Sequence, residues 1–139
     1  MKNNINYTMK EKYALFALEW CNIHFGKCKR KRRELIFELN PKKKINKRAY
    51  YGYYCFYRNK LTVCINNCET LLDIVQTVIH EYTHYLQSRT KYEYYLKVYS
   101  YSTNPYEKEA KKNELIYGKE CLKTIKNQLK ISNSKTSFK

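Results

Sequence analysis

Aspartate is almost absent from this sequence, since Asp73 is the only one in 139 residues. Acidic residues number 12 in all against 28 Lys and Arg, which gives a formal net charge of +16. Such an excess of positive charge attracts polyanions and anionic surfaces. AT-rich coding sequence would also raise lysine, along with Asn, Ile and Tyr, but it would not remove aspartate. Both explanations of the charge therefore stay open.

Glycine, proline and long apolar runs are scarce as well. With 3 Gly and 2 Pro, the chain is neither collagen-like nor of low complexity. No uncharged apolar run approaches the roughly 20 residues that a membrane span needs, so no membrane partner is expected. Hydrophobic residues at 43% and charged residues at 29% are typical of a globular domain. We expect a single domain over residues 1–131, followed by a polar C-terminal tail over 132–139.

No CxxC pair occurs among the six cysteines, which stand at positions 21, 28, 55, 64, 68 and 121. The first ten residues are polar and do not resemble a signal peptide. We therefore expect an intracellular, cytoplasmic protein, not a secreted one, with reduced thiols. The spacing of Cys21, His24 and Cys28 is compatible with structural zinc, but packed free thiols are the favoured interpretation.

Hydrophobic periodicity and capping residues predict an α+β fold with a small antiparallel sheet. Thr8 with Glu11 indicates the start of the first helix, and Gly26 its end. Thr70 indicates the start of a second helix, and Asn104-Pro105 the start of the last. The expected elements, in order, are a helix over 8–26, a strand over 35–39, a hairpin of strands over 50–57 and 61–65, a helix over 70–89, a tyrosine-rich connector over 90–103 and a helix over 104–129.

The second helix carries His80-Glu81-Tyr82-Thr83-His84, an HExxH motif. Residues four apart lie on one face of a helix, so both imidazoles can reach one tetrahedral zinc ion. Glu81, beside the first histidine, can then accept a proton from zinc-bound water. A shuffled chain of this composition would contain the motif in about one sequence in two hundred.

The helix context supports this interpretation. An apolar stripe lies roughly opposite the two histidines, so the helix can pack on a core while His80 and His84 face a cleft. The stripe consists of Leu72, Val75, Ile79, Tyr82 and Leu86. The alternative is that the two histidines are partly buried and pair with Glu81 to stabilise the helix, without a metal.

A catalytic zinc ion needs a third protein ligand and an open position. No histidine follows the motif, and His24 lies far upstream. A glutamate from the last helix is the natural donor, and two candidates follow Pro105, namely Glu107 and Glu109. The residues alone do not choose between them.

The HExxH helix followed by Asn104-Pro105-Tyr106-Glu107-Lys108-Glu109-Ala110 resembles the compact gluzincin-type zinc metallopeptidases, of which the ImmA/IrrE-like and SprT-like proteins are the nearest in length and order. The resemblance covers roughly residues 50–115. In these families the second helix often carries E-x-x-A-[DN], with the first Glu as third zinc ligand. The resemblance implies a zincin-like minimal metallopeptidase domain with Zn²⁺ on His80, His84 and Glu107, and Ala110 packed behind the ligand.

The resemblance also implies a function: zinc-dependent hydrolysis of peptide bonds, with Glu81 as general base and a protein or peptide substrate held at the edge of the hairpin. Two positions depart from the family pattern. Lys111 replaces the Asp or Asn that usually orients a zinc-bound histidine, and the third histidine of typical SprT-like enzymes is absent. A different residue must therefore orient the ligand here.

Peptide hydrolysis also needs a hydrogen-bond donor for the developing oxyanion, and tyrosine often supplies it in zincins. The sequence does not choose among its candidates, which are Tyr92, Tyr94, Tyr95, Tyr99, Tyr101 and Tyr106.

Two basic runs, Lys27–Arg33 and Lys42–Arg48, precede the tyrosines of the hairpin. Charge interleaved with aromatic rings is a pattern that binds single-stranded nucleic acid, although a solvated basic surface explains it as well. The alternative function is therefore a basic nucleic-acid-binding or partner-binding protein on a catalytically inactive zincin-like scaffold.

Overall fold

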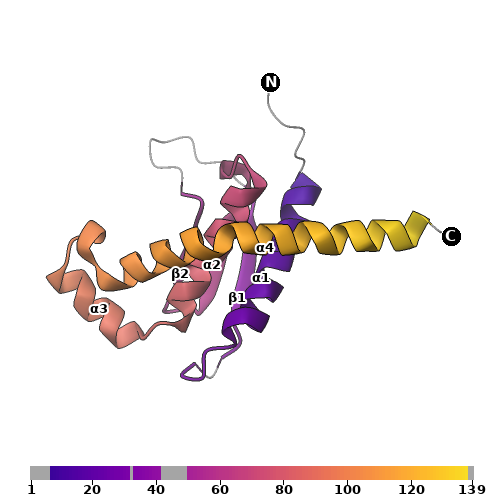
Figure 1. Cartoon of the computed structure of the whole chain (residues 1–139). Coiled ribbons are helices and arrows are strands. Elements are labelled where there is room, and N and C mark those ends of the chain that lie inside the picture. The colour runs from indigo at the N-terminus through magenta and orange to yellow at the C-terminus, as the bar shows by residue number, and fades with distance from the viewer. Residues whose placement is uncertain (1–6, 32, 42–49, 138–139) are drawn as a thin grey trace.

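A computed structural model describes residues 7–31, 33–41 and 50–137, with side chains as far as residue 131. The fold is α+β, as predicted (Figure 1). The elements, in chain order, are α1 (Tyr7–Phe25), β1 (Ile36–Asn40), β2 (Gly52–Cys55), β3 (Lys60–Cys64), η1 (Ile65–Asn67), α2 (Leu71–Leu86), α3 (Arg89–Val98), η2 (Tyr101–Thr103) and α4 (Pro105–Ser137).

The three strands form a mixed sheet in the order β1-β3-β2. β2 and β3 pair antiparallel, with Gly52 opposite Val63, which confirms the predicted hairpin. β1 pairs parallel to β3, with Ile36 opposite Lys60, so the expectation of a wholly antiparallel sheet is wrong. A tight turn fixes how β2 meets β3, but no local signal fixes the edge to which β1 adds.

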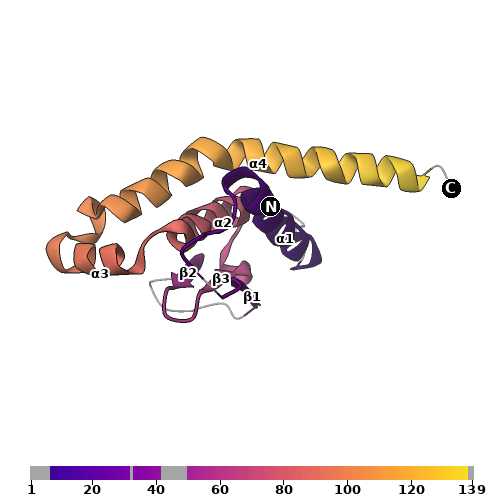
Figure 2. The same ribbon diagram turned by 90° about the horizontal axis from the view of Figure 1, so that it is seen from below.

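α2 lies at the centre of the molecule and packs against α1, the sheet and α4 (Figure 2). Its start is confirmed: the Thr70 hydroxyl accepts from the Asp73 N–H at 3.0 Å, and the Asp73 carboxylate accepts from the Thr70 N–H at 3.1 Å. The single aspartate of the chain therefore completes a capping box. The buried apolar residues of α2 are Ile74, Val75, Val78, Ile79, Tyr82 and Tyr85.

α2 ends at Leu86, earlier than the predicted residue 89, and the predicted connector is largely helical. Ser88 begins α3, because its hydroxyl accepts from the Lys91 N–H at 3.3 Å. None of the residues of α3 is buried, so this helix has no face that packs into the core. A cap and tyrosine contacts such as Tyr95 with Tyr106 place this helix instead.

The ends of α1 agree only in part with the ends predicted from the sequence. Thr8 lies inside the helix and is not its cap, since Tyr7 is already helical. Gly26 has φ +82°, and its N–H donates to the Asn22 carbonyl at 3.0 Å, which confirms the predicted glycine end. The face of α1 that packs on α2 is made of small and thiol side chains together with Tyr13.

α4 begins as predicted, with the Asn104 side-chain oxygen accepting from the Tyr106 N–H at 2.9 Å and Pro105 in the first helical position. The helix continues to Ser137, well past the predicted end near residue 129, and its C-terminal half extends beyond the rest of the molecule (Figure 1). In the part of the chain that the structure describes, no helix combines the length and the apolar character needed to span a bilayer.

Candidate metal centre

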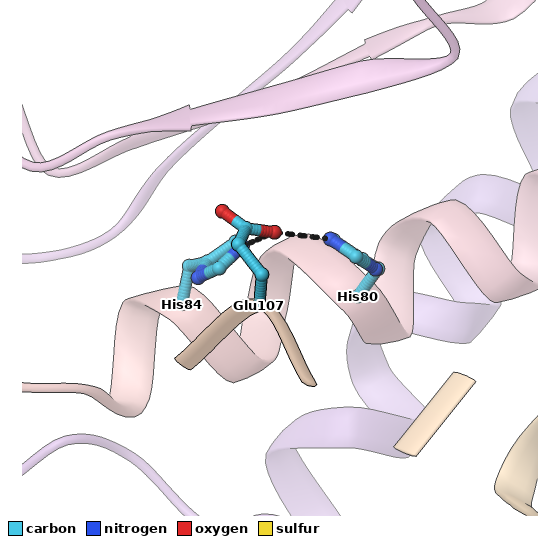
Figure 3. Close-up of side chains that lie close together, drawn as sticks. All are labelled: His80, His84 and Glu107. Carbon is cyan, nitrogen blue, oxygen red and sulfur yellow. Dashed lines mark hydrogen bonds and ion pairs between the residues drawn. The ribbon is translucent and has the colours of Figure 1, made fainter. Parts of the chain in front are cut away.

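Two helices bring three potential ligands together. His80 and His84 lie one turn apart on α2, and α4, which runs antiparallel beside it, presents Glu107 to both (Figure 3). Glu107 Oε1 lies 3.4 Å from His80 Nε2 and 3.2 Å from His84 Nε2. The three ligand atoms lie within 4.8 Å of one another, and no other group of three such residues gathers in this way within the described ranges.

These distances fit a tetrahedral ion. Ligand atoms at the zinc distances of about 2.0–2.1 Å, set at the tetrahedral angle, lie about 3.4 Å from each other. Both distances between an imidazole nitrogen and Glu107 Oε1 are close to that value. The side chains of His84 and Glu107 are almost buried and that of His80 is only slightly exposed, as expected for ligands held by packing.

Hydrogen bonds on the far side of each ring fix the two imidazoles. His80 Nδ1 lies 2.6 Å from Glu114 Oε1, and His84 Nδ1 lies 2.7 Å from Gln87 Oε1. Both partners are acceptors, so each Nδ1 carries the proton and, in the neutral ring, each Nε2 presents a lone pair. Two lone pairs then converge on the carboxylate of Glu107. That convergence is favourable only with a cation or a proton between the groups.

Glu114, and not Lys111, contacts the ring of His80. It lies two helical turns beyond Glu107 on the same face of α4, and its Oε1 accepts from His80 Nδ1. Lys111 lies at the surface, 3.7 Å from the other Glu114 oxygen. Sequence reasoning missed Glu114, although its spacing of seven residues from Glu107 was a usable signal.

Glu109 faces a different partner. Its Oε1 accepts from Gln87 Nε2 at 2.7 Å, and the same amide donates to the Tyr106 carbonyl at 3.0 Å. These bonds hold the Gln87 amide so that its oxygen faces His84. The structure thus gathers Glu107 with the histidines, whereas Glu109 supports Gln87, a residue that sequence reasoning did not connect with the site.

The acidic and basic groups shift one another's protonation. Burial lowers the pKa of His80, but hydrogen bonds with Glu107 and Glu114 outweigh it and raise that pKa to about 10. Burial tends to raise the pKa of Glu107, yet the two histidines hold it well below its usual range. A metal ion must therefore displace a proton from His80. Burial also raises the pKa of Glu81, against the opposing effect of both histidines.

An open cleft of about 970 Å³ exposes one side of this cluster. His80 and Glu81 lie in it, Gly52 of the edge strand β2 lines one wall, and Lys111 of α4 lines another. Gly52 has a steric reason to be glycine, because a Cβ there would lie 2.6 Å from the Thr62 carbonyl oxygen. The cleft provides space for a ligand beside His80 and beside β2, which is an outer strand of the described sheet.

The structure distinguishes the candidate oxyanion-binding tyrosines by their position relative to the cleft. Tyr101 lines the cleft with His80 and Glu81, and 74% of it is exposed. The Tyr92 hydroxyl donates to Glu107 Oε2 at 2.9 Å, so it is committed to the ligand. The remaining candidates, Tyr94, Tyr95, Tyr99 and Tyr106, do not line the cleft.

Several side chains of the first basic run, Lys27–Arg33, form hydrogen bonds within the molecule. Lys31 Nζ donates to the carbonyls of Tyr85 and Gln87, and Arg30 donates to the carbonyl of Leu86 at 2.7 Å. Arg33 donates to the Tyr57 carbonyl. The run Lys42–Arg48 lies outside the described residues. Nucleic-acid binding by the two runs stays a prediction. Two side chains of the first run, Arg30 and Lys31, bind backbone carbonyls at the C-terminal end of α2.

Comparisons with protein-family models, with curated proteins and with solved structures find no match for this chain. What is known of the site therefore comes from its geometry. The buried His80, His84 and Glu107 fit an HExxH…E zincin-like motif and form a possible metal-binding site.

Proposed function

We propose that this protein is a small zinc-dependent metallopeptidase of the gluzincin type. The observation that carries the proposal is the convergence of His80, His84 and Glu107 beside Glu81 in an open cleft. A purely structural trio would have no need of a cleft, or of orienting bonds on both imidazoles. Three protein ligands also leave the fourth tetrahedral position open, as catalysis requires.

Each residue has a distinct task in this proposal. His80, His84 and Glu107 hold the ion, while Glu114 and Gln87 keep both Nε2 atoms aimed at it. When bound, zinc lowers the pKa of a water molecule and polarises the peptide carbonyl. Glu81 accepts the proton of that water and passes it to the leaving amine, for which its burial and raised pKa suit it.

An extended peptide is the substrate class that the cleft favours. β2 is an edge strand, so its outer backbone groups can pair with a substrate strand that lies over the histidines. A cytoplasmic location is part of the proposal and is supported by the six cysteines, which are free thiols.

Metal content and hydrolysis test the proposal together. The purified full chain should contain one zinc ion and cleave members of a peptide library. Glu81→Gln should retain zinc and the fold but lose nearly all cleavage, because an amide cannot accept the proton. Glu93→Gln, on the exposed surface of α3, is the matched control and should cleave normally. Loss of zinc in Glu81→Gln, or undiminished cleavage, would contradict the assigned role. Zinc binding without any cleavage by the wild type would favour the inactive scaffold.

Tyr101 is the oxyanion donor in this proposal, because among the candidate tyrosines it alone lines the cleft beside His80 and Glu81. Tyr101→Phe should lower kcat by about a hundredfold with little change in KM, as expected for the loss of one transition-state donor. The control is Tyr94→Phe on α3, which should leave both constants unchanged. A rise in KM alone would make Tyr101 a substrate-binding residue instead.

A further inference from the structure

A second hollow lies away from the metal centre, between the N-terminal half of α1 and the C-terminal half of α4. This α1/α4 groove has a volume of about 790 Å³. Its apolar lining consists of Met9, Tyr13, Leu122 and Leu129, and its lysines are Lys12, Lys119, Lys123, Lys126 and Lys130. The described residues that line it include neither an acidic side chain nor an arginine.

The lysines of α4 form a regular row along the groove. Lys119, Lys123, Lys126 and Lys130 are four, three and four residues apart, which places them within an arc of about 60° on one face of the helix. The row spans about 17 Å. All four are exposed, and Lys12 of α1 stands on the opposite wall. Like charges at this spacing destabilise a helix, so an anionic partner along the row would relieve that repulsion.

The apolar lining of the groove limits which kinds of anionic partner can fill it. Leu122 and Leu129 line the same groove as the lysine row, and both are half-buried residues that pack against the hydrophobic core. A ligand that fills the groove must therefore offer an apolar surface flanked by negative charge. We propose that the α1/α4 groove binds an acidic amphipathic helix of a partner protein.

Periodicity supports a helix as the occupant. A helix that lies along α4 would repeat its acidic residues every three or four positions, at the same spacing as the lysines. Its apolar stripe would face Leu122, Leu129 and Met9, and its far side would approach Lys12.

The observations favour a peptide over a polynucleotide. Single-stranded nucleic acid binds to aromatic platforms as well as to charge, and Tyr13, the aromatic residue of the groove, is only 6% exposed. Its ring therefore offers no face for a base. The leucines of the groove would also be left uncovered by a phosphate backbone.

The groove shares no lining residue with the metal cleft, so a partner bound there leaves the cleft open. The proposal is consequently independent of zinc and of catalysis.

Fluorescence anisotropy with the full chain tests the groove. The probe is a labelled peptide of about 18 residues, made of Leu, Glu and Ala, with one leucine stripe flanked by glutamates. A shuffled peptide of the same composition and a labelled all-thymidine oligonucleotide serve as comparison probes. The patterned peptide should bind more tightly than either. Tighter binding of the oligonucleotide, or equal binding of the shuffled peptide, would overturn the proposal.

Two kinds of variant locate the binding. Changing Lys119, Lys123, Lys126 and Lys130 together to Gln should weaken binding by about tenfold or more, as four lost charge contacts would. The control removes equal charge from exposed lysines elsewhere, at Lys27, Lys29, Lys91 and Lys97.

Leu129→Gln should weaken binding by a similar factor without changing the charge. Circular dichroism and urea denaturation verify that each variant folds. An equal effect of the control lysines, or full binding by Leu129→Gln, would mean that charge alone attracts the peptide and would refute the groove.

Discussion

Glu107 and Glu109 lie two residues apart on α4, and their carboxylates contact different partners. Adjacent-but-one positions on a helix point about 200° apart, so only one of them can face the histidines. Glu107 does so, with its second oxygen held by Tyr92. Glu109 bonds to Gln87, which in turn positions His84. Glu107 therefore contacts the histidines directly, whereas Glu109 reaches His84 only through the Gln87 amide.

This difference predicts a ranking of two matched variants. Glu107→Ala should reduce zinc affinity by several orders of magnitude, because two remaining ligands hold the ion poorly. Glu109→Ala should reduce it by about tenfold, since it removes only a support of Gln87. Competition with a chromophoric chelator measures both. The reverse ranking would show that α4 turns a different face to α2 than the structure has it.

The residues of the site differ in how far the sequence predicts them. His80, Glu81 and His84 form a local pattern on one helix, so they are visible without a structure. Glu107 follows from resemblance, with Glu109 as its rival. Glu114 and Gln87 escape prediction because their role depends on how two helices align, and a single sequence does not specify that alignment.

At the scale of the element, the C-terminal end of α2 depends on Lys31. Its ammonium group donates to the Tyr85 carbonyl at 2.6 Å and to the Gln87 carbonyl at 2.9 Å, both of which lie at the end of the helix. The same group lies within 6 Å of the ring centroids of Tyr54, Phe56 and Tyr85. A positive charge here also complements the negative end of the helix dipole.

Lys31→Met should therefore lower the free energy of unfolding by about 2 kcal/mol, because two buried carbonyls lose a charged donor. Urea denaturation measures the change. Lys29→Met, at an exposed position of the same basic run, is the control and should have little effect. Zinc affinity should fall with Lys31→Met as well, since His84 lies in the last turn of α2. Equal stability of the two variants would mean that solvent satisfies these carbonyls.

The elements with local signals are the ones that the sequence predicts. The capping box at Thr70, the glycine after α1 and the Asn-Pro start of α4 each place a boundary correctly. The strand β1 is predicted but its parallel pairing with β3 is not, and α3 is missed, in each case for a physical reason. The edge that β1 joins is a long-range choice, and α3 has no buried stripe to reveal it.

At the scale of the whole molecule, the candidate metal centre lies between two helices that are distant in sequence. α2 lies in the core and α4 crosses its outer side, so an ion bound by both would act as a cross-link between the core and the C-terminal helix (Figure 2). Without an ion, His80 still contacts Glu107 and Glu114, and α2 still packs along α4.

Zinc should consequently stabilise the folded chain by mass action. Zinc at about 100 times its Kd should raise the free energy of unfolding by about 2.7 kcal/mol, and Tm by roughly 5–10 °C. Differential scanning fluorimetry of chelator-treated protein, with and without added zinc, measures this shift. Glu81→Gln should show the full shift because Glu81 is not a ligand, whereas His84→Ala should show almost none. If His84→Ala kept the full shift, the ion would be bound elsewhere, with the cysteine thiols as the next donors to test. Because Glu81→Gln keeps the shift but loses cleavage, the pair of variants separates binding of the metal from chemistry at the metal.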